Sequence, residues 1–286
     1  MSVNADIDYD IAYNDQFNIR SLKVLGDDCI GLTFNSSIVK ITSDGNVEEL
    51  LSKEQALQLS PYGISSIGVD SLNNIYAMCE LNMNTRIPVT IFRLDINLHV
   101  TDTLIVNDTT ECNIVTGSDG SLYFEYHNGF LDSIVTIIKV YDPSFNFKNE
   151  FVIYQNINLK RCSNNRFMAV GYQRGNTNNK FQIMVFDSAF NMISSSDAKE
   201  PFKSDLIFNQ GMNGYRFDII SDNMYITEVR LEKYPYSIIV LSDLQRNTFT
   251  KITVPPDFLY FNATSGKLFG SPKMSSRTFS KFSLRS

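Results

Sequence analysis

Short apolar segments recur along this chain, and a polar turn precedes each of them. The clearest copy is DSLNNIYAM (70–78), in which a turn rich in Asp and Asn leads into an apolar segment that begins at Ile75. Asn, Asp and Gly tolerate the positive φ that a tight hairpin turn requires. Aromatic and β-branched residues favour the strand that follows. Each copy therefore predicts two strands joined by a short turn.

The pattern repeats at a nearly constant interval. Its turns are anchored at six positions, which are Asp28, Asn74, Gly120, Asn165, Asn223 and Gly266. Successive anchors lie 46, 46, 45, 58 and 43 residues apart. A second motif, an apolar segment that ends in a polar residue and a turn, follows at a consistent offset, as in IIKVYDPSFNF and IMVFDSAFNMI. Each unit of about 45 residues predicts a four-stranded antiparallel meander, the size of one propeller blade.

The two ends of the chain together complete the repeat. Joining the segment after Gly266 to the segment before Asp28 gives a last interval of about 48 residues, close to the others. We therefore expect an all-β fold, a single six-bladed β-propeller whose last blade is closed by the N-terminal strand, which leaves no long exposed edge. The expected blades span residues 19–53, 62–106, 111–154, 156–195, 214–254 and 257–286 plus 1–15, with an insertion at about 195–213.

One segment departs from the strand pattern. LLSKEQALQLS (50–60) has a helical pattern, with Ser52 placed to cap its first turn and Glu54 within that turn. We expect a short helix that connects two blades.

The composition is that of a globular protein without an affinity for polyanions. The chain has 286 residues, of which 43% are hydrophobic and 20% charged, so it can bury a sizeable core. Its net charge of -6 creates no field that attracts phosphate, and we expect no nucleic-acid partner and no binding to anionic membranes. No apolar run approaches the roughly 18 residues of a membrane span.

The N-terminal segment and the cysteines leave the compartment open. MSVNADIDYDIAYND (1–15) is acidic and lacks the apolar core of a signal peptide. A cytoplasmic or virion-associated protein fits this segment, and so does a secreted one whose signal has been removed. The four cysteines, Cys29, Cys79, Cys112 and Cys162, form no CxxC pair. Their spacing favours buried thiols, although one or two disulfides would suit a secreted protein.

The copy GISSIGVDSLNNIYAM (63–78) resembles the strand-turn-strand repeat of NHL-type and SMP-30-like six-bladed propellers. The resemblance covers essentially the whole chain as a pattern, and it implies a fold more than an activity. SMP-30-like enzymes are calcium- or zinc-dependent lactonases that hold their metal at the channel mouth with a Glu, Asn residues and an Asp. No segment near the N-terminus of this chain matches the one that carries their Glu, so the lactonase activity does not transfer.

In a propeller blade, the loop between the second and third strands and the connection to the next blade lie on one face. Because this chain places its long polar segments there, we expect that face to bind ligands. The candidate binding residues at the channel mouth are Arg20, Glu80, Glu111, Glu125, His127, Asn158, Arg216, Glu228, Arg230 and Asp257. They would suit a small polar ligand, a carbohydrate or a metal, or they serve as solvated loop residues and as hydrogen-bond partners between blades.

Two further groups of residues stand out on the same face. His127, between Glu125 and Asn128, is a candidate general base if a partner orients it, and a solvated loop histidine if not. Arg174, Tyr234 and Tyr236 are candidates for contact with a partner, since Tyr and Arg are favoured at interfaces.

No motif predicts a resident metal or a catalytic centre. The chain has no HxH, HExxH, EF-hand loop, Gly-rich phosphate loop or G-x-S-x-G elbow. A calcium ion held in the central channel by carbonyl groups would leave no such motif and stays open. We therefore expect a non-catalytic propeller that acts as a binding or scaffold module for a protein or glycan partner. The alternatives are an SMP-30-like metal-dependent hydrolase, lactonase or lyase, and a structural component of a virus particle or surface apparatus.

Overall fold

The computed structural model of the protein describes its regular elements and the turns of its middle part. The described residues are 7–14, 19–42, 46–79, 88–106, 112–128, 135–162, 166–173, 180–197, 216–221, 224–230, 237–243, 248–254, 258–264, 267–272 and 278–284. Side chains are described for most of these residues between 19 and 196.

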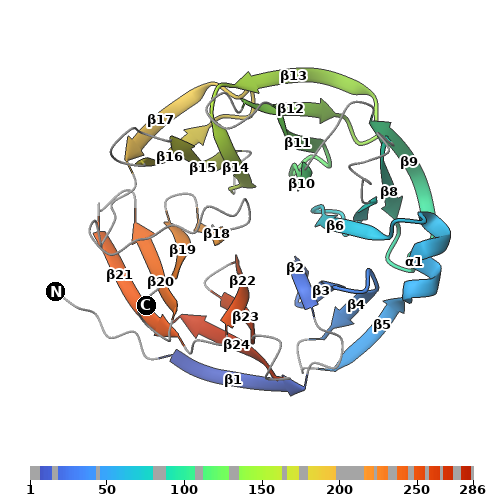
Figure 1. Ribbon diagram of the computed structural model, residues 1–286, viewed down its shortest axis with the longest axis horizontal. Helices are drawn as coiled ribbons and strands as arrows, with labels where there is room; N and C mark the ends of the chain where they lie inside the picture. Colours follow the sequence, from blue (N-terminus) through green and yellow to red (C-terminus); the bar gives the residue numbers. More distant parts are fainter. Residues whose placement is uncertain are drawn as a thin grey trace. The chain divides into compact units, whose positions relative to one another are not determined.

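The described residues form strands and one short helix, arranged in four-stranded antiparallel sheets (Figure 1). The chain divides into two compact units, and the larger one comprises residues 20–43 and 47–198. Its sheets, here called blades 1 to 4, are composed as follows. Blade 1 contains β2 (Ile19–Leu25), β3 (Asp28–Thr33), β4 (Ile38–Ile41) and β5 (Val47–Leu51). Blade 2 contains β6 (Ile64–Val69), β7 (Ile75–Cys79), β8 (Val89–Leu94) and β9 (Val100–Val106). Blade 3 contains β10 (Cys112–Thr116), β11 (Leu122–Asn128), β12 (Val135–Tyr141) and β13 (Phe147–Ile153). Blade 4 contains β14 (Asn156–Arg161), β15 (Phe167–Gln173), β16 (Lys180–Phe186) and β17 (Met192–Asp197).

The smaller unit contains two more four-stranded sheets. One consists of β18 (Arg216–Ser221), β19 (Met224–Arg230), β20 (Ser237–Asp243) and β21 (Thr248–Val254). The other consists of β22 (Phe258–Thr264), β23 (Lys267–Pro272), β24 (Thr278–Leu284) and β1 (Ile7–Asn14). β1 pairs antiparallel with β24, from Ile7 opposite Leu284 to Asn14 opposite Thr278. The prediction that the N-terminal strand completes the last sheet is confirmed.

The predicted meander is also confirmed, because the strands of blades 1 to 4 pair in sequence order. In the larger unit, the first strand of each blade lies on the inner side and the fourth on the outer side (Figure 1). The body described as one unit has four blades, rather than the six of the predicted single ring. The all-β propeller architecture is therefore confirmed, and the expected ring of six is not. Most of the predicted insertion, residues 198–213, lies outside the described residues.

Apolar clusters join each blade of the larger unit to the next. The first cluster joins blades 1 and 2 through Ile30, Ile38, Ile64 and Ala77. The second joins blades 2 and 3 through Tyr76, Ile91, Ile114 and Phe124. The third joins blades 3 and 4 through Tyr123, Ile138, Leu159 and Phe167. Adjacent residues such as Tyr123 and Phe124 belong to different clusters because successive side chains of a strand point to opposite faces.

A five-residue turn of the form D-x-x-x-N or D-x-x-x-H explains much of the repeat. Asp70, Asp95, Asp142 and Asp187 each begin such a turn, and the Oδ1 atom of each accepts hydrogen bonds from two backbone N–H groups of its turn. The fourth residue has a positive φ in every case, which is the geometry of a type I turn followed by a bulge. These fourth residues are Asn73, Leu98, Phe145 and Phe190.

In three of the turns, the fourth residue also fills the contact with the preceding blade. Leu98 belongs to the first cluster, and Phe145 and Phe190 pack against the second and third. Phe190 stacks on Phe151 and Phe167, with ring centroids 4.7 and 4.8 Å apart. The turn that ends a hairpin in one blade therefore also fixes that blade against its neighbour.

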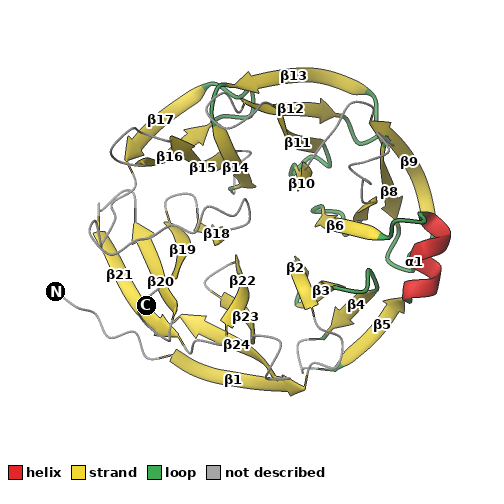
Figure 2. Ribbon diagram, viewed as in Figure 1, coloured by secondary structure: helices red, strands yellow, loops and turns green. Residues whose placement is uncertain are grey.

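The predicted helix is confirmed as α1 (Lys53–Leu59), which follows the outer strand of blade 1 (Figure 2). Ser52 and Gln55 form a capping box, in which the Ser52 side chain accepts from the Gln55 N–H and the Gln55 side chain accepts from the Ser52 N–H. Three of the cysteines, Cys29, Cys79 and Cys162, are buried thiols, as expected. Among the described residues, no helix has the length and apolar character needed to span a membrane.

Candidate functional site

The structure describes the side chains of three of the ten predicted channel-mouth residues, Glu125, His127 and Asn158. Four others lie in strands of which only the backbone is described, namely Arg20, Arg216, Glu228 and Arg230. The remaining three, and the predicted partner contacts, lie outside the described residues; these are Glu80, Glu111, Asp257, Arg174, Tyr234 and Tyr236. The candidate site is therefore built here from the first group and its neighbours.

Glu125 lies on β11, and its side chain points at the backbone of blade 4. The residue is only 1% exposed. The Leu159 N–H of β14 donates to both carboxyl oxygens, at 3.3 and 3.2 Å, and Asn113 Nδ2 of β10 donates to Oε2 at 3.3 Å. β14 is an edge strand of its sheet, so part of its backbone has no strand partner. Glu125 supplies the missing acceptor, because a buried N–H group without one is costly.

The surroundings of Glu125 favour its neutral form. Burial raises the pKa of the carboxyl to about 7, because a charge loses the stabilisation that water would give it. The Leu159 N–H, the Asn113 amide and the positive charge of Lys160 act in the opposite direction and are outweighed. Glu125 therefore changes charge close to neutral pH.

His127 lies two residues further along β11, on the same side of the strand as Glu125. Its Nδ1 is 3.1 Å from Thr136 Oγ1, and its Nε2 is 4.0 Å from Glu125 Oε1. The Thr136 hydroxyl donates to the Gln155 carbonyl at 2.8 Å and accepts from the Ile157 N–H at 3.0 Å. Because the single hydroxyl proton of Thr136 goes to that carbonyl, His127 Nδ1 must be the donor to Oγ1. The neutral ring then turns its basic Nε2 toward Glu125.

The position of His127 corrects one alternative drawn from the sequence. His127 is a strand residue with a side chain 31% exposed, and the interpretation as a solvated loop histidine is wrong. Burial lowers the pKa of its imidazole, which favours the neutral ring. Glu125 is equally not a solvated loop residue, because it is buried between two blades. Of the three described candidates, only Asn158 is exposed.

An acid that titrates near neutral pH beside an imidazole is the composition of a general acid–base pair. In this structure, however, the carboxyl faces the backbone of β14, and His127 Nδ1 is bound to Thr136. Within the described part of the chain, no group of three or more His, Cys, Asp or Glu residues is placed to hold a metal ion. The polar groups of this cluster join blade 3 to blade 4.

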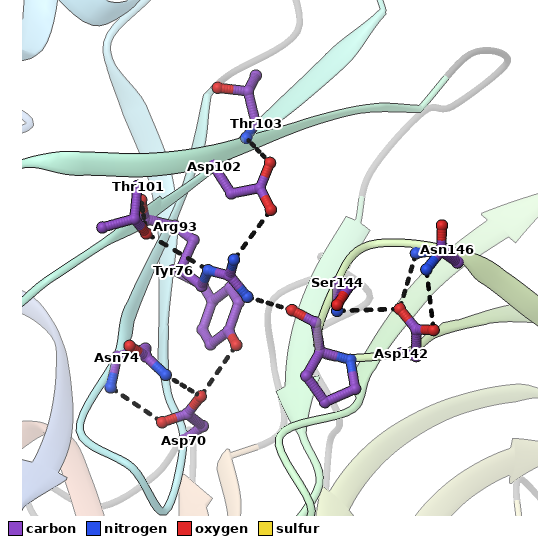
Figure 3. Close-up of polar contacts among 11 residues, drawn as sticks. Asp70, Asn74, Tyr76, Arg93, Thr101, Asp102, Thr103, Asp142, Ser144 and Asn146 are labelled. Carbon is purple, nitrogen blue, oxygen red and sulfur yellow. Dashed lines mark hydrogen bonds and ion pairs between the residues drawn. The ribbon is translucent and has the colours of Figure 1, made fainter.

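A second polar cluster, which the sequence pattern did not reveal, joins blades 2 and 3 (Figure 3). Asp70 begins one of the five-residue turns, and its Oδ2 accepts from Asn74 Nδ2 at 2.8 Å and from the Tyr76 hydroxyl at 2.9 Å. Tyr76 is 1% exposed, and burial, reinforced by the negative charge of Asp70, raises the pKa of its phenol. The turn and the buried core of blade 2 are therefore held together by one carboxylate.

Arg93 on β8 carries this second cluster across to blade 3. Its Nη2 lies 2.9 Å from Asp102 Oδ2, and its Nη1 donates to the Pro143 carbonyl in the turn between β12 and β13 (Figure 3). The guanidinium also lies over the Phe145 ring, 5.1 Å from its centroid. Arg93 is the one charged residue of the strand VTIFRL, and this is the local signal that could have marked it as a candidate.

Comparisons with known proteins bear on the fold. Neither a protein-family model nor a curated protein matches the sequence. An auxiliary nutrient binding protein from Bacteroides ovatus is similar at 9% identity and a TM-score of 0.56, over 96% of this chain and 70% of the other. The BBS1N chain, in complex with ARL6DN, is similar at 9% identity and a TM-score of 0.54, over 99% and 98%.

A third neighbour names the architecture. The β-propeller domain of the Trilobed protease from Pyrococcus furiosus is similar at 12% identity and a TM-score of 0.52, over 92% of this chain and 79% of the other. That domain is described as having an open velcro topology, whereas β1 pairs with β24 here. At such identities the likeness concerns the fold alone, and the resemblance to NHL-type propellers stays a prediction. The chain is an all-β propeller.

Proposed function

We propose that this chain is a non-catalytic β-propeller that acts as a binding or scaffold module for a protein or glycan partner. The observation that most supports this proposal is the direction in which the Glu125 side chain points. This carboxyl, which titrates near neutral pH and has an imidazole beside it, is bound to the backbone of the next blade. Its chemistry serves the rigidity of the scaffold.

Two structural neighbours are consistent with a binding role. One is named as an auxiliary nutrient binding protein, and another was observed in complex with ARL6DN. Propellers of one architecture host many unrelated functions, so these names indicate the range of roles rather than the partner. A rigid scaffold that carries long polar loops suits recognition, because the loops vary while the blades hold them in place.

The binding role is tested by comparing the full chain with a variant in which Arg174, Tyr234 and Tyr236 are all replaced by Ala. Both are used as bait on a glycan array and in quantitative capture from extracts of the source organism. We expect at least one partner whose capture falls about tenfold in the triple variant, as loss of interface Tyr and Arg side chains predicts. Lys148→Ala, on the exposed strand β13, is the matched control and should capture as well as the wild type.

The competing enzymatic role makes the opposite prediction. The purified chain is incubated with lactones, esters and oligosaccharides, with and without millimolar Ca²⁺ or Zn²⁺. We expect no turnover, and we expect no rise in the melting temperature on adding metal. A bound ion would raise the melting temperature, because it would stabilise the fold by mass action. Metal-dependent turnover would overturn the proposal and favour the SMP-30-like alternative.

A further inference from the structure

The contact between blades 3 and 4 has a property that the binding role does not require. A full carboxyl group lies in a site that water does not reach, at 1% exposure, while an imidazole at its edge is 31% exposed. His127 Nε2 and Glu125 Oε1 lie 4.0 Å apart, which is too far for a hydrogen bond. An acid and a base in this position are coupled, because the charge of either one changes the proton affinity of the other.

We propose that Glu125 and His127 form a proton-dependent link between blades 3 and 4, which weakens when the carboxyl loses its proton. In the protonated form, Glu125 is neutral, and its oxygens still accept from the Leu159 N–H and the Asn113 amide. In the ionised form, a negative charge is enclosed between two blades. The hydrogen bonds to it become stronger, but the loss of hydration costs more.

Too few polar or charged groups surround the Glu125 carboxyl to stabilise its negative charge. On β10 the facing side chain is Asn113, and on β12 the residues opposite Glu125 and His127 are Ile138 and Thr136, none of which is charged. From β14 the positive charge of Lys160 acts on the carboxyl. Lys139 of β12 is directed to the Tyr126 ring, with its Nζ 5.4 Å from the centroid, and Tyr126 belongs to the contact with blade 2.

The imidazole of His127 forms the second half of the link. His127 Nδ1 holds Thr136, whose hydroxyl contacts both Gln155 and Ile157 at the beginning of blade 4. When Glu125 is ionised, the nearest base to it is His127 Nε2, which would carry a proton to neutralise the pair. Burial opposes the charged imidazole as well, so neither partner holds a charge without cost.

The sign of the effect follows from the raised pKa of Glu125. The unfolded chain releases this proton near pH 4.5, and the folded chain releases it near pH 7. The stability that this group contributes is fully present below pH 4.5 and is lost as the pH rises toward 7. The difference corresponds to at most about 300-fold in the folding equilibrium constant. Its direction is opposite to that of an ordinary salt-bridged acid.

The experiment uses the full chain. The ¹³C shift of the Glu125 carboxyl and the shift of the Leu159 amide are followed by NMR from pH 4 to pH 9. We expect both to titrate together near pH 7, because the amide donates directly to the carboxyl. Titration of both between pH 4 and pH 5 would overturn the proposal. This measurement needs no variant, so it decides the question even if Glu125 variants do not fold.

Denaturant unfolding of Glu125→Gln supplies the second readout. The ratio of its folding constant to that of the wild type should rise by up to about 70-fold between pH 5 and pH 8, since Gln carries no charge to bury. His127 is present in both proteins, so the part of its titration that does not depend on the Glu125 charge cancels in the ratio. Glu150→Gln, on the exposed part of β13, is the matched control and should leave the ratio constant. A constant ratio for Glu125→Gln would contradict the proposal.

Discussion

Two contacts between neighbouring blades each depend on an ionisable side chain, but these two side chains differ in burial and in charge. Between blades 2 and 3, the Arg93 guanidinium stays charged, with 20% of its side chain exposed and Asp102, the Pro143 carbonyl and the Phe145 ring around it. Between blades 3 and 4, the Glu125 carboxyl is buried, and its oxygens accept from the Leu159 backbone. A charge with many partners and some water can stay ionised, whereas a buried one is held more firmly when neutral.

The largest effect is expected at the buried contact. Glu125→Ala removes the acceptor of the Leu159 N–H and leaves a cavity, so it should lower the free energy of unfolding by about 3 kcal/mol. Denaturant unfolding at pH 6 measures the change. Asn158→Ala, on the exposed side of β14, is the control and should cost less than about 0.5 kcal/mol. Equal stability of the two variants would mean that the contact between β11 and β14 does not stabilise the fold.

The charged contact should be the weaker of the two. Arg93→Ala loses the bond to the Pro143 carbonyl, the ion pair with Asp102 and the contact with the Phe145 ring, at a cost of about 2 kcal/mol. Arg93→Lys should recover less than half of it, because an ammonium group cannot reproduce the planar, forked geometry of the guanidinium. The same unfolding experiment, repeated at high salt, measures the loss of stability in both variants. Full recovery by Lys would mean that charge alone makes the contact.

The smallest effect concerns the turn that supports the charged contact. Asn73 is exposed and has a φ of 64°, which costs an L-residue more than a glycine. Asn73→Gly should therefore raise the free energy of unfolding by about 0.5 kcal/mol, and Asn73→Val should lower it by about 1 kcal/mol. Thermal unfolding detects both changes. A loss of stability in the Gly variant would show that the Asn73 side chain itself holds the turn.

The difference between the two contacts also marks how far the sequence could predict the structure. The turn anchors, the four-stranded meander and the Ser52 cap depend on neighbouring residues, and local pattern was sufficient for them. The pairing of β1 with β24 joins the two ends of the chain, and the regular interval of the repeat predicted it. The sequence also selected Glu125 and His127 as chemically interesting. It placed them where the second strand meets the loop at the channel mouth, with hydrogen bonding between blades as one alternative. β11 extends to Asn128, and Glu125 makes a hydrogen bond of that kind.

The contacts themselves could not be predicted from local pattern. Glu125 meets Leu159 across 34 residues, and Arg93 meets Pro143 across 50. Whether a polar residue near the end of a strand is solvated or buried depends on how the next blade packs against it. Single-residue chemistry identified Glu125 as a candidate, and only the packing of β14 assigned it to the scaffold.

The central claim is that Glu125 holds blade 4 to blade 3 through the Leu159 backbone. Native-state hydrogen exchange at the Leu159 amide tests it most directly, with the Ile157 amide, which Thr136 holds, as the reference in the same strand. In Glu125→Ala, we expect exchange at Leu159 to accelerate about tenfold or more relative to Ile157, the effect of losing roughly 1.4 kcal/mol of local protection. An unchanged ratio of the two rates would contradict the account.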